Sequence, residues 1–234
     1  ITILPGEVTI FDYYDGKFLL SKSSPSDDIF DTLLWARSDI SIVVVPSFIK
    51  RIESSAFSYS SLKQISINAS VTSIDRFAFY KCQYLEQVTI PSSVTRINDW
   101  TFCECESLKS ILIPSSVTSI GNGSFEGCSS LEEIDIPSSV TDIGAKAFCD
   151  CKSLTKIAFP SSVTEIQREI LGGCTSLKQI SIPSSIVRTD ANAFKGCSSL
   201  EEIEIPSSVT EVSSYIFDGC SSLKRITIRL CETS

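Results

Sequence analysis

The fold is decided by Pro114–Ile136, PSSVTSIGNGSFEGCSSLEEIDI, and by the copy that follows it, Pro137–Phe159, PSSVTDIGAKAFCDCKSLTKIAF. Eight copies of this block succeed one another over residues 46–228, and seven of them are 23 residues long. The copies begin at Pro46, Asn68, Pro91, Pro114, Pro137, Pro160, Pro183 and Pro206. A fixed period of this size is typical of a solenoid, in which each repeat packs on its neighbours.

One repeat predicts a short strand followed by a turn. Ile111 and Ile113 alternate to one side, as in a strand with a buried inner face, and Pro114 ends the strand because it cannot donate to a sheet. The following segment is expected to form a short helical turn that buries Phe125 and Cys128. Stacked coils would place equivalent strands in one long parallel sheet about 4.8 Å apart. We therefore expect an α/β solenoid with this sheet on its concave face and short helical turns or irregular segments opposite.

The repeat resembles a known family. Residues 46–228 follow L-x-x-I-x-I-P-S-S-V-T-x-I-x-x-x-A-F-x-x-C, which resembles the BspA-like class of leucine-rich repeat, and residues 23–45 follow it weakly. The resemblance implies a leucine-rich repeat solenoid. Members of this family look like cell-surface or secreted proteins of anaerobic bacteria and protist parasites, and some are implicated in adhesion to host extracellular-matrix proteins. The resemblance thus implies an adhesin-like protein-interaction module.

The ends of the chain depart from the repeat. We expect residues 1–22 to form a β-hairpin-like cap, residues 23–45 a divergent first repeat, and residues 229–234 the start of a truncated repeat. In the divergent repeat, the apolar residues spaced as in a clear copy are Ile29, Leu34, Ile40, Val43 and Val45. The last full coil would expose apolar side chains and a strand edge, so we expect the chain to continue there or a partner to dock.

Composition excludes several classes of function. The formal net charge of −8 argues against binding to nucleic acid or to an anionic membrane, since phosphate binding needs clustered Lys and Arg. No apolar run approaches the ~20 residues of a membrane span, so direct membrane insertion is not expected. The chain has no histidine, which excludes Ser-His-Asp and Cys-His catalysis and histidine-ligated zinc. We expect no enzymatic activity, no cofactor and no metal site.

The ten cysteines divide into three groups. Seven recur once per repeat at an apolar position, which predicts a column of buried, reduced thiols. Cys103 and Cys149 take a repeat position that holds Glu126 or a similar charged residue elsewhere, which predicts exposed free thiols. Cys231 lies beyond the last full repeat and either pairs with another chain or has no role.

Alternation also predicts which side chains face outward from the parallel sheet. The candidate ligand-binding residues on this concave ribbon are Gln87, Thr89, Ser110, Leu112, Glu133, Asp135, Lys156, Gln179, Glu202 and Glu204. Solenoid curvature makes such a surface suitable for a protein ligand. The competing interpretation is a plain solvated face, which every solenoid needs on its outer strand surface.

One further column alternates in charge, and it predicts cross-strand pairing rather than a site. Its members are Lys63, Glu86, Lys109, Glu132, Thr155, Lys178, Glu201 and Lys224.

Two functions remain open from the sequence. The first is a non-enzymatic binding module at the cell surface or outside the cell, with a protein as ligand. The second is a cytoplasmic or cytoskeletal scaffold, in which the solenoid is a rigid part of a larger assembly; reduced thiols fit this alternative, because disulfides typify small secreted domains. Asn68 and Asn122 stand in acceptor sequons and are candidate glycosylation sites if a eukaryote secretes the chain.

Overall fold

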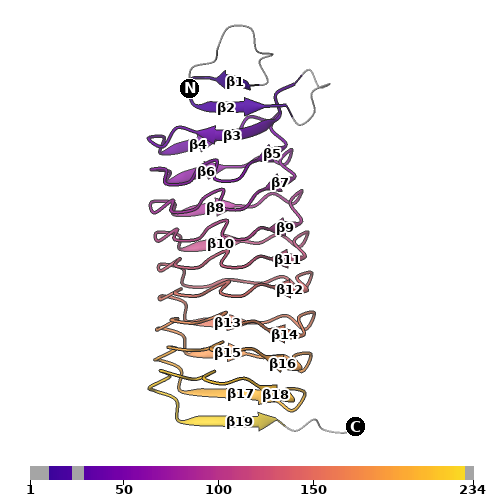
Figure 1. Cartoon of the computed structure of the whole chain (residues 1–234), viewed down its shortest axis with the longest axis vertical. Helices are drawn as coiled ribbons and strands as arrows, with labels where there is room; N and C mark the ends of the chain where they lie inside the picture. The colour runs from indigo at the N-terminus through magenta and orange to yellow at the C-terminus, as the bar shows by residue number, and fades with distance from the viewer. Residues whose placement is uncertain (1–10, 23–28, 230–234) are drawn as a thin grey trace.

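The chain winds into a stack of coils, with an antiparallel hairpin at one end of the stack and β19 at the other (Figure 1). The computed structural model describes residues 11–22 and 29–229. No helix occurs in these ranges, so this part of the solenoid consists of strands and turns. The expected parallel-strand solenoid is therefore present, and the expectation of helical turns is wrong.

Each coil contributes to two separate ladders of short parallel strands. The first ladder contains the predicted strands, namely β4 (Ile42–Val44), β6 (Gln64–Ser66), β8 (Gln87–Thr89), β10 (Ser110–Leu112), β13 (Lys156–Ala158), β15 (Gln179–Ser181), β17 (Glu202–Pro206) and β19 (Arg225–Arg229). The second ladder, which the sequence pattern did not predict, contains β5 (Arg51–Ile52), β7 (Ser73–Ile74), β9 (Arg96–Ile97), β11 (Ser119–Ile120), β12 (Asp142–Ile143), β14 (Glu165–Ile166), β16 (Arg188–Thr189) and β18 (Glu211–Val212).

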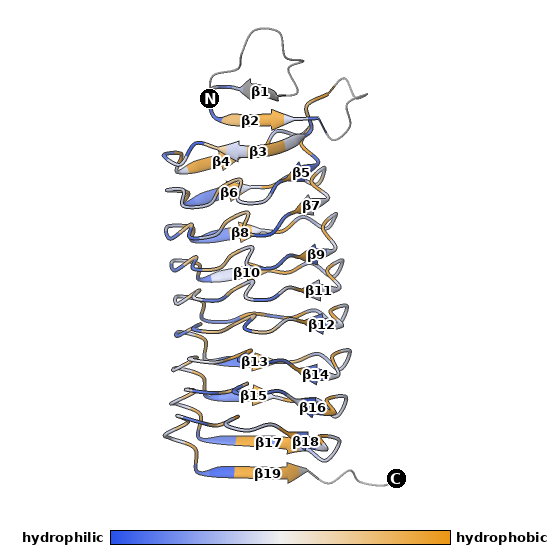
Figure 2. Ribbon diagram, viewed as in Figure 1, coloured by the Kyte–Doolittle hydropathy of each residue, from blue (hydrophilic) through white to orange (hydrophobic). Residues whose placement is uncertain are grey.

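The pattern within one coil explains the burial. In β10, Ile111 is buried between the exposed Ser110 and Leu112, as period-2 alternation requires. In β11, Ile120 is fully buried and Ser119 lies at the surface edge. Figure 2 shows both hydrophilic (blue) and hydrophobic (orange) residues within single strands such as β17 and β19. Both ladders thus direct their apolar side chains into one shared core.

The turn segment that joins the two ladders is not helical because its backbone enters the left-handed region twice. In the clearest coil these residues are Gly123 (φ 55°) and Gly127 (φ 73°), and a right-handed helix cannot contain such positions. Backbone N–H groups bond instead to the next coil, as Phe125 does to the carbonyl of Ala147 (2.9 Å) and Gly127 to that of Cys149 (2.8 Å). The turn segments therefore add a third line of hydrogen bonds between coils.

Neither ladder is continuous, which corrects the expectation of one long sheet. In the first ladder, residues 133–135 form no strand and pair with neither β10 nor β13, and β15 does not pair with β17. In the second ladder, β7 does not pair with β9 and β12 does not pair with β14. The described strands form six sheets, of five, four, three, three, two and two strands.

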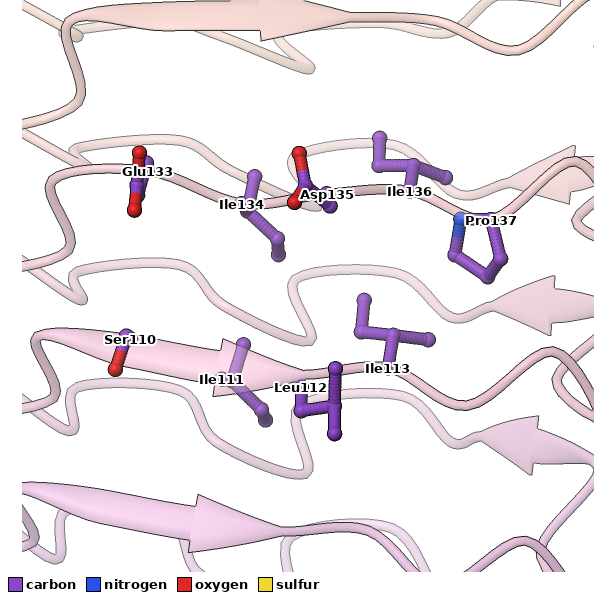
Figure 3. A pocket seen from close by; sticks show the side chains of 9 residues that line it. All are labelled: Ser110, Ile111, Leu112, Ile113, Glu133, Ile134, Asp135, Ile136 and Pro137. Carbon is purple, nitrogen blue, oxygen red and sulfur yellow. The ribbon is translucent and has the colours of Figure 1, made fainter.

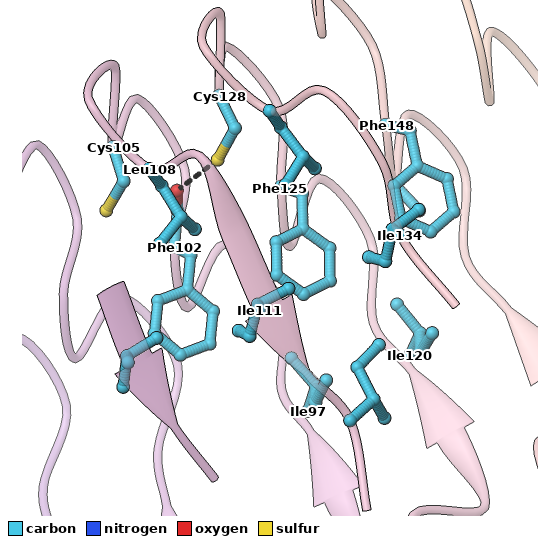
Figure 4. Packing of buried hydrophobic residues seen from close by; sticks show 14 of the residues in the cluster. Ile97, Phe102, Cys105, Leu108, Ile111, Ile120, Phe125, Cys128, Ile134 and Phe148 are labelled. Carbon is cyan, nitrogen blue, oxygen red and sulfur yellow. Dashed lines mark hydrogen bonds between the residues drawn. The ribbon is translucent and has the colours of Figure 1, made fainter. Parts of the chain in front are cut away.

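Stacked phenyl rings run through the core (Figure 4). Successive rings lie 5.2 Å apart from Phe57 to Phe79 and from Phe79 to Phe102, then 5.6 Å to Phe125 and 5.7 Å to Phe148, and all four pairs are within 9° of parallel. Leu171 interrupts the column before the last pair, Phe194 and Phe217. The uniform spacing shows that each coil from Phe57 to Phe148 adds one ring in the same place.

The repeating cysteine lies beside this column and is buried as a thiol. Cys128 is fully buried, and its Sγ donates a hydrogen bond to the backbone carbonyl of Phe102 in the preceding coil (3.2 Å), drawn as a dashed line in Figure 4. The equivalent bonds of the other six members measure 3.1–3.4 Å and are donated by Cys82, Cys105, Cys151, Cys174, Cys197 and Cys220. The nine cysteines in the described ranges are all free.

The second serine of each Pro-Ser-Ser turn also joins neighbouring coils. Ser116 Oγ donates to the carbonyl of Val94 (2.7 Å), and Ser139 Oγ donates to that of Val117 (2.6 Å). These bonds explain why a small hydroxyl residue recurs at this position, since the carbonyl would otherwise be left without this partner.

The start of the described chain corrects one placement. Strands β1 (Phe11–Tyr14) and β2 (Phe18–Ser21) form an antiparallel hairpin, and β2 pairs antiparallel with β3 (Thr32–Ala36). β3 pairs with β5 so that Leu33 lies opposite Ile52, a place that the spacing gave to Ile29. Ile29 is exposed instead. Val43 lies opposite Ile65, so Leu33 and Val43 are only ten positions apart, four fewer than Ile120 and Ile134 in a full repeat. The shorter coil therefore brings Leu33, and not Ile29, into the core. The part of the cap prediction that concerns residues 1–10 lies outside the described residues.

At the opposite end, the final strand leaves apolar side chains uncovered. Ile226 and Ile228 in β19 are 50% and 66% exposed, although the equivalent Ile203 and Ile205 in β17 are buried. Among the described residues, no further coil packs on β19.

Candidate functional site

The outward side chains of the first ladder form a continuous surface, which we call the strand face. It comprises the outward residues of β4, β6, β8, β10, residues 133–135, β13, β15, β17 and β19. Each of the ten candidate binding residues lies on this surface and is exposed: Gln87, Thr89, Ser110, Leu112, Glu133, Asp135, Lys156, Gln179, Glu202 and Glu204. The alternation therefore places these side chains correctly, whereas their role in binding stays a prediction.

The strand face is mainly polar with isolated apolar residues. Ile42, Val44 and Leu112 project from it with 65%, 71% and 68% of their surface exposed. No aromatic side chain projects from the described strands of this ladder. Such a surface suits contacts with a polar protein surface better than stacking on sugar rings.

The strand face has two acidic pairs, Glu133 with Asp135 and Glu202 with Glu204. In each pair the first residue forms an ion pair with one basic residue of the next coil. Glu133 Oε2 lies 3.9 Å from Lys156 Nζ, and Glu202 Oε2 lies 3.2 Å from Arg225 Nη1. Asp135 has no cation within 4.0 Å in the described ranges. Both pairs are well exposed, so each contributes at most about 1 kcal/mol and leaves the carboxylates accessible.

The alternating charge column beside the strand face forms fewer contacts than expected. Within residues 11–22 and 29–229, the only pair of this column closer than 4.0 Å is Glu201 with Lys224, at 2.9 Å. The hydrogen bond and the positive charge of Lys224 lower the pKa of Glu201. The other members of the column are too far apart for direct pairing, so the predicted cross-strand bridges are mostly absent.

A small hollow opens on the strand face where the ladder is interrupted (Figure 3). It measures about 170 Å³ and lies between β10, with Ser110 and Leu112, and the unpaired segment that carries Glu133 and Asp135. No backbone hydrogen bond joins β10 to residues 133–136 in the structure. The hollow thus adds free peptide groups to the polar side chains that the sequence predicted.

Cys103 and Cys149 contradict the prediction of exposed thiols. They are 5% and 9% exposed, and burial raises the pKa of each to about 12. Their repeat position holds the longer Glu126 and Lys195 in other coils, whose charged ends reach the surface while their stems lie against the coil. A cysteine has no such end, so it stays within the buried part of the position. A thiol with this pKa is a weak nucleophile at neutral pH.

The two glycosylation candidates differ in geometry. The side-chain nitrogen of Asn68 donates to the carbonyls of Val45 (2.8 Å) and Pro46 (2.9 Å), which occupies the atom that would carry a glycan. Asn122 is exposed, and its nitrogen makes only a 3.3 Å contact with Asp99. The folded structure therefore favours Asn122, and modification of either residue stays a prediction.

The described residues form neither a metal-binding cluster nor a membrane-spanning helix. No three Cys, Asp or Glu side chains among them gather as metal ligands, and none of their helices could cross a membrane, since they form none.

Comparison with known proteins agrees with this architecture. The BspA type leucine rich repeat region matches residues 33–155 and 141–233, in six copies. No curated protein matches the chain. A leucine rich cell surface protein from Faecalibacterium prausnitzii A2-165 is 32% identical over 82% of this chain and 60% of its own length, with a TM-score of 0.58. This chain therefore spans less than two thirds of that protein.

Two further solved structures have the same fold. The T. pallidum leucine rich repeat protein is 27% identical, covers 80% of this chain and 89% of its own, and has a TM-score of 0.71. A leucine-rich repeat protein from Eubacterium ventriosum is 26% identical over 88% of this chain and 52% of its own, with a TM-score of 0.67. With its repeats matched over most of its length, the chain belongs to the BspA-type leucine-rich repeat family.

Proposed function

We propose that the chain is a non-enzymatic protein-interaction module that binds a protein ligand through the strand face. The observation that carries the proposal is the unbroken succession of exposed side chains from β4 to β19, which no described segment covers. Repeats of this family generally mediate protein interactions, and an extended solenoid surface fits a partner that contacts several coils. The acidic residues Glu133, Asp135, Glu202 and Glu204 give this surface a preference for partners with complementary positive charge.

We further propose that the module acts at the cell surface or outside the cell, as an adhesin-like protein. The F. prausnitzii relative, described as a cell surface protein, supports this location. The alternative, an intracellular structural scaffold, is favoured by one observation: all nine cysteines in the described ranges are free thiols. A partner that docks on the uncovered final coil, where Ile226 and Ile228 are exposed, would fit either location.

Binding of the purified chain to a panel of extracellular-matrix proteins, measured by biolayer interferometry, tests the proposal. The variant Glu202→Gln with Glu204→Gln is expected to weaken binding to the captured protein about tenfold, since charged hydrogen bonds contribute about 1.5–3 kcal/mol. The matched control is Asp142→Asn with Glu211→Gln, which removes the same charge from exposed residues of the second ladder. Equal loss in both variants, or no binding to any panel member, would contradict the adhesin-like proposal.

A further inference from the structure

A second candidate surface lies on the turn segments, away from the strand face, and it is built from aromatic residues. Phe77 and Trp100 occupy equivalent positions in successive coils and stack at 5.2 Å with an interplanar angle of 7°. Tyr80 packs edge-on against Phe77 at 5.6 Å, and Tyr59 packs edge-on against Tyr80 at 5.5 Å. Four aromatic side chains from three neighbouring coils thus form one cluster at the surface.

This cluster sits on strained backbone. Phe77 and Trp100 have φ angles of 59° and 52°, in the left-handed region that large side chains rarely adopt. The next coil has glycine at this position, Gly123, and the one after it has Lys146. The left-handed conformation recurs at this position in the other full coils, at Ser55, Glu169, Asn192 and Tyr215, so it belongs to the repeat. The two bulky rings are therefore placed here against the local preference of the chain.

A hollow of about 350 Å³ opens beside the aromatic cluster. It is lined by an aromatic side, with Phe77, Tyr80 and Trp100, and by an acidic wall, with Glu104, Glu126 and Asp150. The Trp100 ring lies over a glycine of the next coil: its indole nitrogen would be 2.5 Å from a Cβ added at Gly123, so a side chain there would displace the ring. Gly123 therefore allows Trp100 to take the place from which it lines the hollow.

The carboxylates of this wall are incompletely neutralised. Glu104 pairs with Lys81 at 3.2 Å, but Glu126 lies 3.9 Å from Lys146. Burial raises the pKa of Glu126 above its ordinary value despite that lysine. Asp150 accepts a 3.8 Å contact from the thiol of Cys149, and no ion pair within 4.0 Å reaches it in the described ranges. No basic residue lines the hollow itself, so its field attracts a cation.

The aromatic rings already contact two cations of this chain, since Lys81 lies over Tyr59 and Tyr80 and Arg76 lies over the other two rings. The Arg76 guanidinium carbon lies 5.2 Å from the centroid of the Phe77 ring and 5.9 Å from that of Trp100. This contact shows that the pair accepts a planar cation on its face. A hollow lined by both aromatic rings and carboxylates matches the two ways in which arginine binds, by stacking and by a forked pair of hydrogen bonds.

We propose that the hollow beside Trp100 binds an arginine side chain presented by a basic segment of a partner protein. The guanidinium stacks on the aromatic side and donates to Glu126 and Asp150. A lysine ammonium offers neither the flat face nor the forked donors, so it binds more weakly. A neutral sugar would use the rings but would leave the negative charge of the wall unmatched. This site shares no residue with the strand face, so the result of its test does not depend on whether the strand face binds a protein.

A titration followed by NMR tests the site in the whole chain. The probe is the capped tripeptide acetyl-Gly-Arg-Gly-amide, and the signal is the indole N–H of Trp100, distinguished from that of Trp35 by the variant Trp100→Phe. We expect a saturable shift of the Trp100 signal. The variant Glu126→Gln with Asp150→Asn is expected to weaken binding about tenfold. The peptide with citrulline in place of arginine, which keeps the shape and lacks the charge, is expected to cause no saturable shift.

The control variant is again Asp142→Asn with Glu211→Gln, which makes the same change in net charge at two exposed residues that do not line the hollow and should leave the affinity unchanged. Equal weakening by the control would show nonspecific attraction and overturn the proposal. So would equal binding of the citrulline peptide, or a saturable shift with galactose and none with the arginine peptide. Thermal unfolding of each variant confirms that a lost signal reflects the site rather than the fold.

Discussion

The phenyl column offers the sharpest test of how this solenoid is held together. Phe125 is fully buried, with its ring 5.6 Å from that of Phe102 and 5.7 Å from that of Phe148. Replacement of a buried phenylalanine by alanine costs about 3–5 kcal/mol through lost transfer energy and the cavity left behind. Because Phe125→Ala also removes two ring-stacking contacts, we expect it to lower the free energy of unfolding by about 5 kcal/mol, at the upper end of this range.

A matched position in the same column gives the comparison. Phe217 occupies the equivalent place in the last coil, is only half-buried, and has one ring neighbour, Phe194, at 5.8 Å. We expect Phe217→Ala to cost about 2 kcal/mol, since less apolar surface is lost from the interior. Phe125→Leu should cost about 1 kcal/mol, because Leu171 fills this column position naturally and a hydrophobic replacement of similar volume leaves little cavity.

Guanidinium unfolding followed by circular dichroism measures the three free energies, and hydrogen exchange locates the loss. Since each repeat contacts only its neighbours, Phe125→Ala should loosen the coils on either side first. Equal destabilisation by Phe125→Ala and Phe217→Ala, or a loss below about 1 kcal/mol for Phe125→Ala, would refute the view that continuous ring stacking stabilises the central coils.

Two further predictions concern ionisable groups. Burial raises the pKa values of Cys103 and Cys149 to about 12, so iodoacetamide at pH 8 should label both only after denaturation. Mass spectrometry measures the labelling, and rapid labelling of the folded protein would contradict their burial. Lys224 lowers the pKa of Glu201, so the stabilising interaction is present at neutral pH and is lost as the pH falls through the lowered pKa. The variant Lys224→Gln should raise the Glu201 midpoint in a carboxyl NMR titration, and an unchanged midpoint would exclude the pairing.

The repeat spacing alone predicted the parts of the structure that depend on periodicity. It placed Ile111, Phe125 and Cys128 in the core and Glu133 and Asp135 outside, because a constant period puts each side chain in the same environment in every coil. The resemblance to the BspA-like family rested on the same residues, and the family match confirms it.

Other features depend on geometry that the pattern does not contain. A two-residue strand such as β11 is too short to show alternation, so the second ladder could not be recognised. The left-handed conformations of Phe77 and Trp100 run against residue preference, and the cluster they form brings together residues from different coils. The sequence contained one indication of this cluster: the repeat position that holds Phe77 and Trp100 in two coils holds Gly123 in the next.

The interruptions of the two ladders have a mechanical consequence. Where the first ladder is broken, on either side of residues 133–135 and between β15 and β17, the second ladder is intact through β9–β11, β11–β12 and β14–β16. Where the second is broken, between β7 and β9 and between β12 and β14, the first is intact through β8–β10 and β13–β15. At every boundary between full coils, at least one ladder therefore joins the two coils by paired strands, so tension along the stack is resisted at each boundary. Where only one ladder is intact, the coils are held on one side, and the stack can bend there.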